Sequence, residues 1–112
     1  MKTTMIIKQT RNQIKTSEIM IRINCFVKVT DKSNVKDVIE HANALVAATL
    51  EHDKGCVAYD FFASTTRDDV FMFCETWEND EMLDIHSKAE HFKTHVGAIE
   101  QMAEISIEKM ER

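Results

Sequence analysis

Residues 70–92, VFMFCETWENDEMLDIHSKAEHF, contain the pattern of a strand, then a break, then helix. Alternate positions of a strand share one face, and those of one parity here are Phe71, Phe73, Glu75 and Trp77. A carboxylate is therefore placed among aromatic side chains, on a surface that such residues normally bury. The break at 78–80 is polar, and His86 and His91 follow it. A helix returning over the strand would place an imidazole near Glu75 and Trp77, so this segment predicts a reactive pocket.

Outward from this segment, strand and helix patterns alternate along the chain. Alternating apolar residues predict strands over 21–29, 56–64, 70–78 and around 105–107. Apolar residues at helical spacing predict helices over 35–52, 80–86 and 88–102. Gly55 is the expected stop signal of the first helix. The order β-α-β-β-α-β predicts an α+β protein of the ferredoxin-like type, in which helices cover one face of an antiparallel sheet.

The second face of the predicted sheet is left without helices. Phe26, Met72 and Cys74 fall on it, and Phe62 joins them if no bulge intervenes. An apolar face of this kind is usually covered. Two-fold dimers are the commonest oligomers, so we expect a homodimer formed face to face.

The composition is that of one ordinary globular domain. The chain has 112 residues, of which 44% are hydrophobic and 29% charged, which suffices for one modest core. Residues 1–19 lack the regular pattern of 20–112, so we predict an N-terminal extension followed by the domain. Three interpretations of the extension stay open: a separate tail, an added edge strand, or an arm around a partner chain.

Charge and cysteine content limit the partners and the environment. The net charge of −5 argues against nucleic acid or an anionic membrane as the main partner. No apolar run approaches the roughly 20 residues of a membrane span, and residues 1–18 lack a secretory signal pattern. Cys25, Cys56 and Cys74 lie in predicted strands without a Cys-x-x-Cys pair. This favours buried free thiols in a reducing cytoplasm.

A set of scattered residues follows the order of the predicted elements. They are Glu51, Gly55–Cys56, Tyr59, Phe73, Glu75, Trp77, Leu83, His86 and His91–Phe92. Together with the β-α-β-β-α-β order, this set resembles the antibiotic biosynthesis monooxygenase family of dimeric α+β barrels, over residues 20–110. The run at 86–95 is most similar to the quinol monooxygenase and autoinducer-2-processing branches.

One position departs from the haem-degrading branch of that family. Members of that branch typically carry an asparagine on the helix-facing side of the first strand. Here Asn24 has the opposite parity, and Cys25 takes that place. This lowers the expectation of haem degradation, although a bulge in the strand would restore the asparagine.

The resemblance implies chemistry without a metal, a flavin or another cofactor, on a small hydroxylated aromatic or quinol. Such a substrate loses a proton, and the carbanion-like product reacts with oxygen directly. His86 suits the general base, because its ordinary pKa is near 6.5. Tyr59 can donate to a substrate oxygen, and a buried Glu75 must be paired or protonated; these three are the predicted catalytic residues. The predicted substrate-binding residues are Trp77, Phe73, Phe71, His91 and Cys25.

Each of these residues also has a structural interpretation. Trp77 can close the core at the strand end, and Tyr59 can have a hydroxyl satisfied within the fold. Glu75 can point out of a frayed edge, and His86 can be a solvated helix residue. The resemblance therefore indicates a site, and the residue types alone leave the structural alternatives open.

A metal site is also considered. His91 and His95 are four residues apart, hence on one helix face, and Glu90 is adjacent. This spacing can bind a metal, but no further ligand is indicated, so no metal site is predicted. His41 and His52 are expected on the surface of the first helix.

The leading hypothesis is a cytoplasmic, homodimeric, cofactor-independent monooxygenase for a small hydroxylated aromatic or quinol. A second hypothesis is isomerisation or breakdown of a small polar signal of the autoinducer-2 type, which predicts activity without oxygen. A third is a non-catalytic ligand-binding module, favoured by the absence of a strong nucleophile or cofactor motif. Haem degradation is the fourth.

Overall fold

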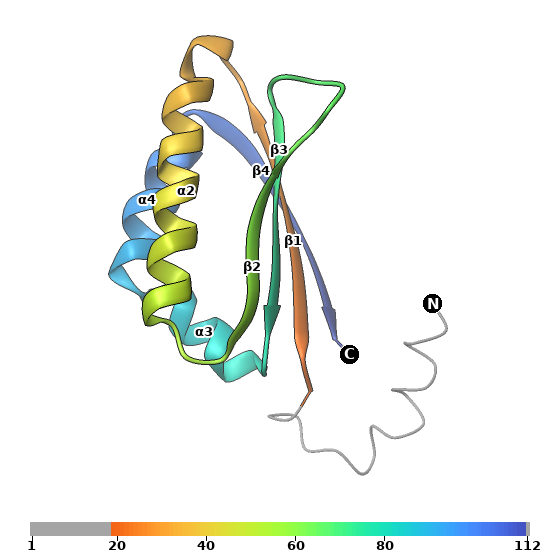
Figure 1. The fold of residues 1–112 in the computed structure, drawn as a ribbon, viewed down its shortest axis with the longest axis vertical. Helices are drawn as coiled ribbons and strands as arrows, with labels where there is room; N and C mark the ends of the chain where they lie inside the picture. Colours follow the sequence, from red (N-terminus) through yellow and green to blue (C-terminus); the bar gives the residue numbers. More distant parts are fainter. Residues whose placement is uncertain (1–18, 112) are drawn as a thin grey trace.

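The computed structural model describes residues 19–111. One sheet is formed by the strands β1 (Ile21–Val29), β2 (Cys56–Ala63), β3 (Val70–Trp77) and β4 (Ala103–Glu111). The helical elements are η3 (Lys32–Asn34), α2 (Val35–His52), α3 (Asp80–Lys88) and α4 (Glu90–Glu100). α2 and α4 run along one face of the sheet, and α3 lies near one end of them (Figure 1). The predicted ferredoxin-like α+β architecture is confirmed, and the predicted extension over 1–19 lies outside the described residues except for Ile19.

The sheet has the strand order β2-β3-β1-β4, with every neighbouring pair antiparallel. β3 lies between β1 and β2, so Glu75 faces Ile23 on one side and Tyr59 on the other. Ile23 in turn faces Lys109 of β4. A row across the helix-facing side of the sheet thus contains Tyr59, Glu75, Ile23 and Lys109, and the predicted site residue Glu75 lies near its centre.

The break between strand and helices after β3 has local causes. The side chain of Asn79 accepts a hydrogen bond from the backbone N–H of Met82 at 2.9 Å, which caps α3. Ala89 is extended and separates α3 from α4. The predicted helices at 80–86 and 88–102 are therefore confirmed, with bounds shifted by about two residues. This break lets α3 turn its histidine toward the sheet.

The connection from α2 to β2 depends on Gly55. Gly55 has a φ of +77°, a conformation that side chains disfavour. A Cβ at this position would clash with the side chain of Met82 in α3. The predicted stop at Gly55 is confirmed, and the glycine also allows the connection to pack closely against α3.

The core lies between the sheet and the helices. Its buried members are Ile21, Ile23, Val27, Val29, Val38, Ala42, Leu45, Tyr59, Phe71, Phe73, Trp77 and Ile99. Trp77 is fully buried, so its structural interpretation holds for this side chain. Two ionisable side chains, those of Glu75 and His86, are buried beside this apolar cluster.

The other face of the sheet carries no helix in the described part of the chain (Figure 1). Phe26, Met72 and Phe62 lie opposite one another across β1, β3 and β2 on this face. The irregularity in β2 falls between Cys56 and Ala58, so it does not displace Phe62. Phe26 and Phe62 remain 38% and 52% exposed, as expected for a face that is bare within one chain.

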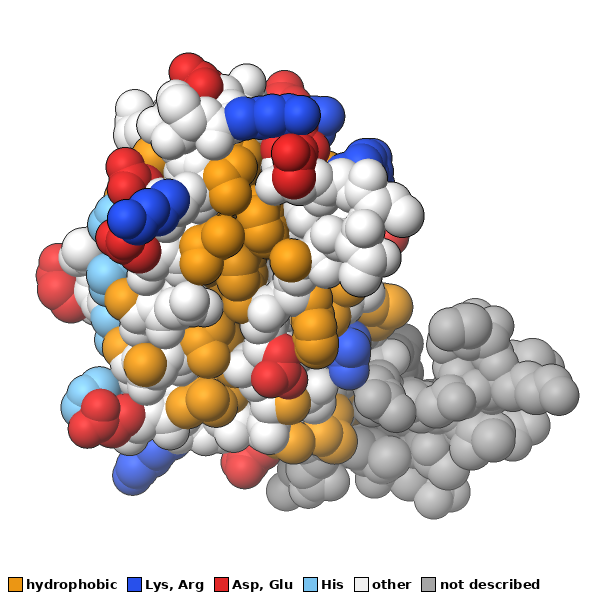
Figure 2. Space-filling model, turned by 45° about the horizontal axis from the view of Figure 1, so that its top comes forward, with side chains coloured by type: hydrophobic (Ala, Val, Ile, Leu, Met, Phe, Trp, Pro, Cys, Tyr) orange, Lys and Arg blue, Asp and Glu red, His pale blue; other side chains and the backbone are white. Residues whose placement is uncertain are grey.

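Figure 2 shows how side chains are distributed on one side of the molecule. Apolar side chains gather in a central patch there, with charged side chains around it and histidines along one edge. None of the helices that the structure describes is both long and apolar enough to cross a bilayer.

Candidate active site

A pocket of about 480 Å³ lies between the sheet and the helices, a size typical of small-molecule sites. The strands contribute Ile23, Cys25, Tyr59, Phe73, Glu75, Ile105, Ile107 and Lys109 to its wall. The helices contribute Leu45, Asp80, Leu83, Asp84, His86, Ser87, Phe92, Val96, Ile99 and Glu100. The interior is mostly apolar, and its polar groups converge from Tyr59, Glu75 and His86. Such a pocket suits a small, largely apolar molecule that carries a few hydrogen-bonding groups.

Glu75 is a buried carboxyl, only 6% exposed. The indole N–H of Trp77 donates a hydrogen bond to its Oε1 at 3.0 Å. Burial raises the pKa of Glu75 to about 7, although the hydrogen bonds from Trp77 and Tyr59 act in the opposite direction. At neutral pH this carboxyl can therefore either accept a proton from a ligand or donate one to it.

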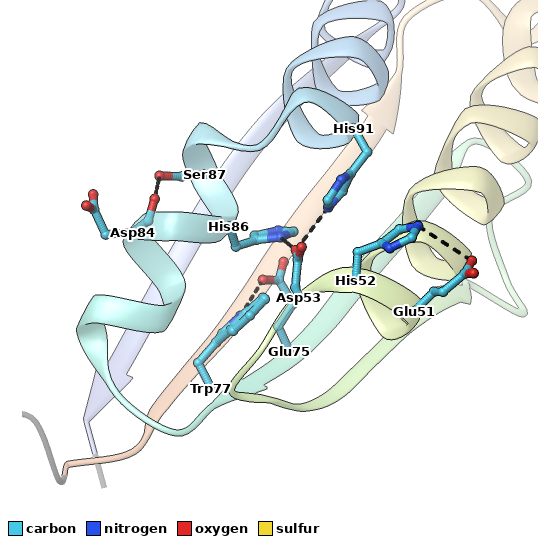
Figure 3. Close-up of polar contacts among 9 residues, drawn as sticks. All are labelled: Glu51, His52, Asp53, Glu75, Trp77, Asp84, His86, Ser87 and His91. Carbon is cyan, nitrogen blue, oxygen red and sulfur yellow. Dashed lines mark hydrogen bonds and ion pairs between the residues drawn. The ribbon is translucent and has the colours of Figure 1, made fainter.

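The imidazole ring of His86 is oriented by a contact with the carboxylate of Asp53. Asp53 lies just after α2, and its Oδ2 is 2.5 Å from Nδ1 of His86. The same oxygen is 3.0 Å from Nε2 of His91 at the start of α4. Figure 3 shows the two imidazoles pointing toward this carboxylate from α3 and α4. Because a carboxylate accepts, Nδ1 of His86 carries the hydrogen, and its Nε2 is left with a lone pair.

The ring of His86 is buried among aromatic side chains. The ring centroid lies 4.5 Å from that of Trp77, 5.0 Å from that of Phe92 and 5.3 Å from that of Tyr59. Nε2 of His86 is buried and makes no hydrogen bond to the described residues. Burial lowers the pKa of His86, and Asp53 partly opposes this. His86 is therefore a neutral imidazole with an unused acceptor on the pocket wall.

Tyr59 and Cys25 complete the polar part of the pocket. Burial, and secondarily the charge of Glu75, raises the pKa of the Tyr59 phenol, so this group acts as a hydrogen-bond donor rather than as a base. The same two causes raise the pKa of Cys25 to about 12. Cys25 is thus a protonated thiol and a poor nucleophile. The three thiols are free as predicted, but only Cys74 is buried, whereas Cys25 and Cys56 are partly buried.

The rim of the pocket is acidic. Asp80, Asp84 and Glu100 lie on it, and Lys109 is the single cation among the described lining residues. Nζ of Lys109 donates to Asp80 at 2.8 Å. The rim therefore offers no uncommitted positive charge to an anionic ligand.

The structure places the predicted site residues in two groups. His86, Glu75, Tyr59, Phe73 and Cys25 line the pocket. Trp77, Phe71 and His91 do not, which differs from their predicted role in substrate binding.

Each of these three side chains instead contacts other residues of the protein. Trp77 lies between two pocket groups, because it bonds to Glu75 and packs on His86. Phe71 stacks on Phe61, with 5.3 Å between the ring centroids. His91 binds Asp53 behind His86. No hydrogen bond between Glu75 and His86 occurs among residues 19–111; Trp77 and Tyr59 each bond to Glu75 and pack beside the ring of His86.

Asp53 is the functional residue that the sequence does not reveal. It stands between a helix end and a glycine, where a carboxylate usually faces solvent, and its partners are 33 and 38 residues away. His95 likewise pairs with His41, at 3.0 Å between their Nδ1 atoms, rather than with His91. Pairings of this kind come from the packing of α2, α3 and α4, and no local spacing predicts them.

The first strand places Cys25 in the pocket, as its parity predicts. β1 pairs with β3 and β4 in continuous register, so no bulge shifts Asn24. Nδ2 of Asn24 lies 3.4 Å from Oε1 of Glu108, on the other face of the sheet. The asparagine of the haem-degrading branch has no equivalent at this position of the pocket.

This combination of a four-stranded antiparallel sheet, covering helices and a mostly apolar pocket between them defines a small-molecule-binding α+β domain. The model of the family called antibiotic biosynthesis monooxygenase matches residues 20–98. The chain therefore belongs to the antibiotic biosynthesis monooxygenase family.

Individual relatives are less informative about the reaction. A protein of unknown function from Bacteroides thetaiotaomicron VPI-5482, described as a possible oxidoreductase, is 48% identical, with a TM-score of 0.81 over 85% of this chain and 99% of that one. A proposed antibiotic biosynthesis monooxygenase from Caulobacter crescentus CB15 is 19% identical, with a TM-score of 0.79 over 94% of this chain and 97% of that one. At that identity the likeness shows the fold alone.

One further relative is longer than the segment over which it matches this chain. An uncharacterised protein of Synechocystis sp. is 34% identical over 62 residues, which is 52% of this chain and 42% of that protein. The match thus spans less than half the length of this relative.

Proposed function

We propose that this chain is an oxidoreductase of the monooxygenase type, which acts on a small, uncharged hydroxylated aromatic or quinol. The observation that carries the proposal is His86. Its Nδ1 is bound to Asp53, and its Nε2 is an unused acceptor on the wall of an apolar pocket. A base so arranged is ready to remove a proton from a bound hydroxyl or activated methylene group.

The first step is proton removal by Nε2 of His86. The imidazolium that forms is stabilised by Asp53, whose carboxylate already accepts the hydrogen on Nδ1. The electron pair left on the substrate is spread over its aromatic system. The hydroxyl of Tyr59 and the carboxyl of Glu75 are the groups that can donate hydrogen bonds to the resulting oxyanion.

The second step is reaction of the electron-rich substrate with oxygen. For a methylene substrate of the anthrone type, one oxygen atom becomes the new carbonyl and the other leaves as water, with the two hydrogens of the methylene carbon. The substrate supplies all the electrons, so the balance needs no external reductant. The proton held by His86 returns to the departing oxygen, and the apolar wall excludes bulk water meanwhile.

The carboxylates of the rim support an uncharged substrate over an anionic one. Lys109 pairs with Asp80, and Glu100 adds a further negative charge to the pocket. The alternative is an isomerase or degrading enzyme for a small polar signal of the autoinducer-2 type. It is tested by repeating the assay without oxygen, because only an isomerase would then turn over.

A homodimer and a cytoplasmic location complete the proposal. The line of Phe26, Met72 and Phe62 on the helix-free face supports dimerisation through that face.

The proposed reaction is tested with ¹⁸O₂ and a panel of hydroquinones and anthrones. We expect one labelled oxygen atom in the product; an unlabelled product, or substrate recovered unchanged throughout the panel, would contradict the proposal.

A further inference from the structure

The donors behind His86 form a group of their own. Asp53, His86 and His91 come from the end of α2, from α3 and from α4, and their ligand atoms all lie within 4.8 Å of one another. The side chains of His86, Asp53 and His91 are 1%, 8% and 19% exposed, respectively. Figure 3 shows the two rings directed at one carboxylate. Asp53 and His91 are not part of the pocket wall, whereas His86 is, so this group adjoins the substrate pocket and shares His86 with it.

The charge and donor set of this group suit a metal cation. The carboxylate of Asp53 is nearly buried, and its Oδ2 is next to one ring nitrogen of His86 and one of His91. A buried carboxylate needs a compensating partner, which a bound cation can supply. Two nitrogen donors and one carboxylate are typical ligands of Zn²⁺ and related divalent transition metals.

The distances are also compatible with such an ion. Oδ2 of Asp53 lies 2.5 Å from Nδ1 of His86 and 3.0 Å from Nε2 of His91. Ligand atoms around a tetrahedral Zn²⁺ lie about 3.3 Å apart, given bond lengths of about 2.0–2.1 Å. Outward shifts of less than about 1 Å would open the group to an ion. Asp53 is the C-cap residue of α2, so its side chain lies at the helix end and not within the helix.

We propose that Asp53, His86 and His91 form a binding site for a divalent transition metal of the Zn²⁺ class, on the side of His86 away from the pocket. Three protein ligands leave one position of a tetrahedral ion for water. Ligation uses the lone pairs of Nδ1 in His86 and Nε2 in His91. The hydrogens that these atoms donate to Asp53 therefore move to the opposite ring nitrogens, and the rings remain neutral.

Occupancy of this site has a consequence for the pocket. With the metal on Nδ1, Nε2 of His86 carries a hydrogen and becomes a donor instead of an acceptor. If His86 is the general base, which is the part that rests on the proposed function, the bound metal inhibits the enzyme. Metal binding itself is independent of that assumption and needs no substrate.

The test uses the full chain after removal of metals with EDTA. Zn²⁺ is added to protein with ¹⁵N-labelled histidine, and the imidazole nitrogens are followed by NMR. We expect saturation at one Zn²⁺ per chain, with the largest shifts at Nδ1 of His86 and Nε2 of His91. Shifts at His41 and His95 instead, or no saturable shift up to millimolar Zn²⁺, would overturn the site.

Matched variants on one helix face give a second readout by calorimetry. His91→Gln should weaken Zn²⁺ binding at least tenfold, and His95→Gln, one turn further along α4, should leave it unchanged. Equal affinity of the His91→Gln variant and the unmodified chain would contradict the proposal. Should His91→Gln fail to fold, the visible spectrum of Co²⁺ bound to the unmodified chain decides, because tetrahedral nitrogen and oxygen ligation gives intense bands that a hydrated ion lacks.

Discussion

Oδ2 of Asp53 lies 2.5 Å from Nδ1 of His86, which is 33 residues further along the chain. The contact joins the end of α2 to α3. It fixes which nitrogen of the imidazole carries the hydrogen, and thereby leaves Nε2, which is buried and has no hydrogen-bond partner among the described residues, as an acceptor. The proposed chemistry depends on this pair more than on any other contact in the molecule.

Replacement of Asp53 by asparagine should disable the base while preserving the shape of the site. An amide N–H can donate to Nδ1 of His86, which favours the tautomer with hydrogen on Nε2 and removes the acceptor. We expect kcat to fall by about 10²–10⁴-fold, the usual contribution of general base catalysis, with a smaller change in KM. Steady-state kinetics on the best substrate of the panel measure this. Asp68→Asn is the control, because Asp68 is 77% exposed and pairs with Lys32; equal losses in both variants would contradict the role of Asp53.

The buried carboxyl of Glu75 should make stability depend on pH. Its pKa is about 7 in the folded chain and 4.5 in the reference state, so between these values the folded state binds more protons than the unfolded state. The free energy of unfolding should therefore decrease as pH rises from about 4.5 to about 7, by roughly 3 kcal/mol from this group. Urea unfolding at several pH values measures the slope. Glu75→Gln should flatten it in this window, and an unchanged slope in that variant would show that Glu75 is not the group responsible.

The two glycines of the chain should respond to alanine in opposite ways. At Gly55 a Cβ meets the side chain of Met82 and the φ is +77°, so Gly55→Ala should destabilise the fold by about 1–3 kcal/mol. At Gly97, within α4, nothing lies within 4 Å of the added Cβ. Gly97→Ala should stabilise the fold by about 0.5–1 kcal/mol, because alanine favours helix. Thermal unfolding of both variants compares them, and a stabilised Gly55→Ala variant would disprove the packing described for the α2–β2 connection.

The helix-free face of the sheet should be sensitive to charge if it forms a dimer. Phe26→Glu places a carboxylate at the β1 end of the line of Phe26, Met72 and Phe62, and its burial in an interface would be costly. We expect the mass measured by light scattering at micromolar concentration to change from dimer to monomer. Ile85→Glu is the control on α3, where Ile85 is 55% exposed. A monomeric unmodified chain, or a Phe26→Glu variant that remains dimeric, would argue against this interface.

Much of this fold can be predicted from sequence because its signals are local. Strand alternation places Phe73 and Glu75 on the helix-facing side, and continuous pairing of β1 keeps Cys25 there. Gly55, which has a positive φ, follows the end of α2 as the predicted stop signal. Each of these inferences needs only the neighbouring residues.

The rest of the site depends on tertiary packing. Trp77 shares the parity of Glu75, but its full burial and its contact with His86 follow from the position of α3. His91 has the spacing of a partner for His95, yet it meets Asp53 because α2 ends beside the start of α4. No local sequence pattern marks Asp53, since an aspartate shortly before a glycine is common in solvent-exposed turns.

The central claim is that Nε2 of His86 removes a proton from a bound, uncharged aromatic hydroxyl compound that then reacts with oxygen. The most direct measurement is oxygen uptake by the metal-free protein with hydroquinones and anthrones, compared with the spontaneous rate and with the His86→Gln variant. We expect uptake well above the spontaneous rate for at least one compound, and a loss of about 10²-fold or more in the variant. Uptake that His86→Gln retains in full, or no uptake above the spontaneous rate with any compound, would contradict it.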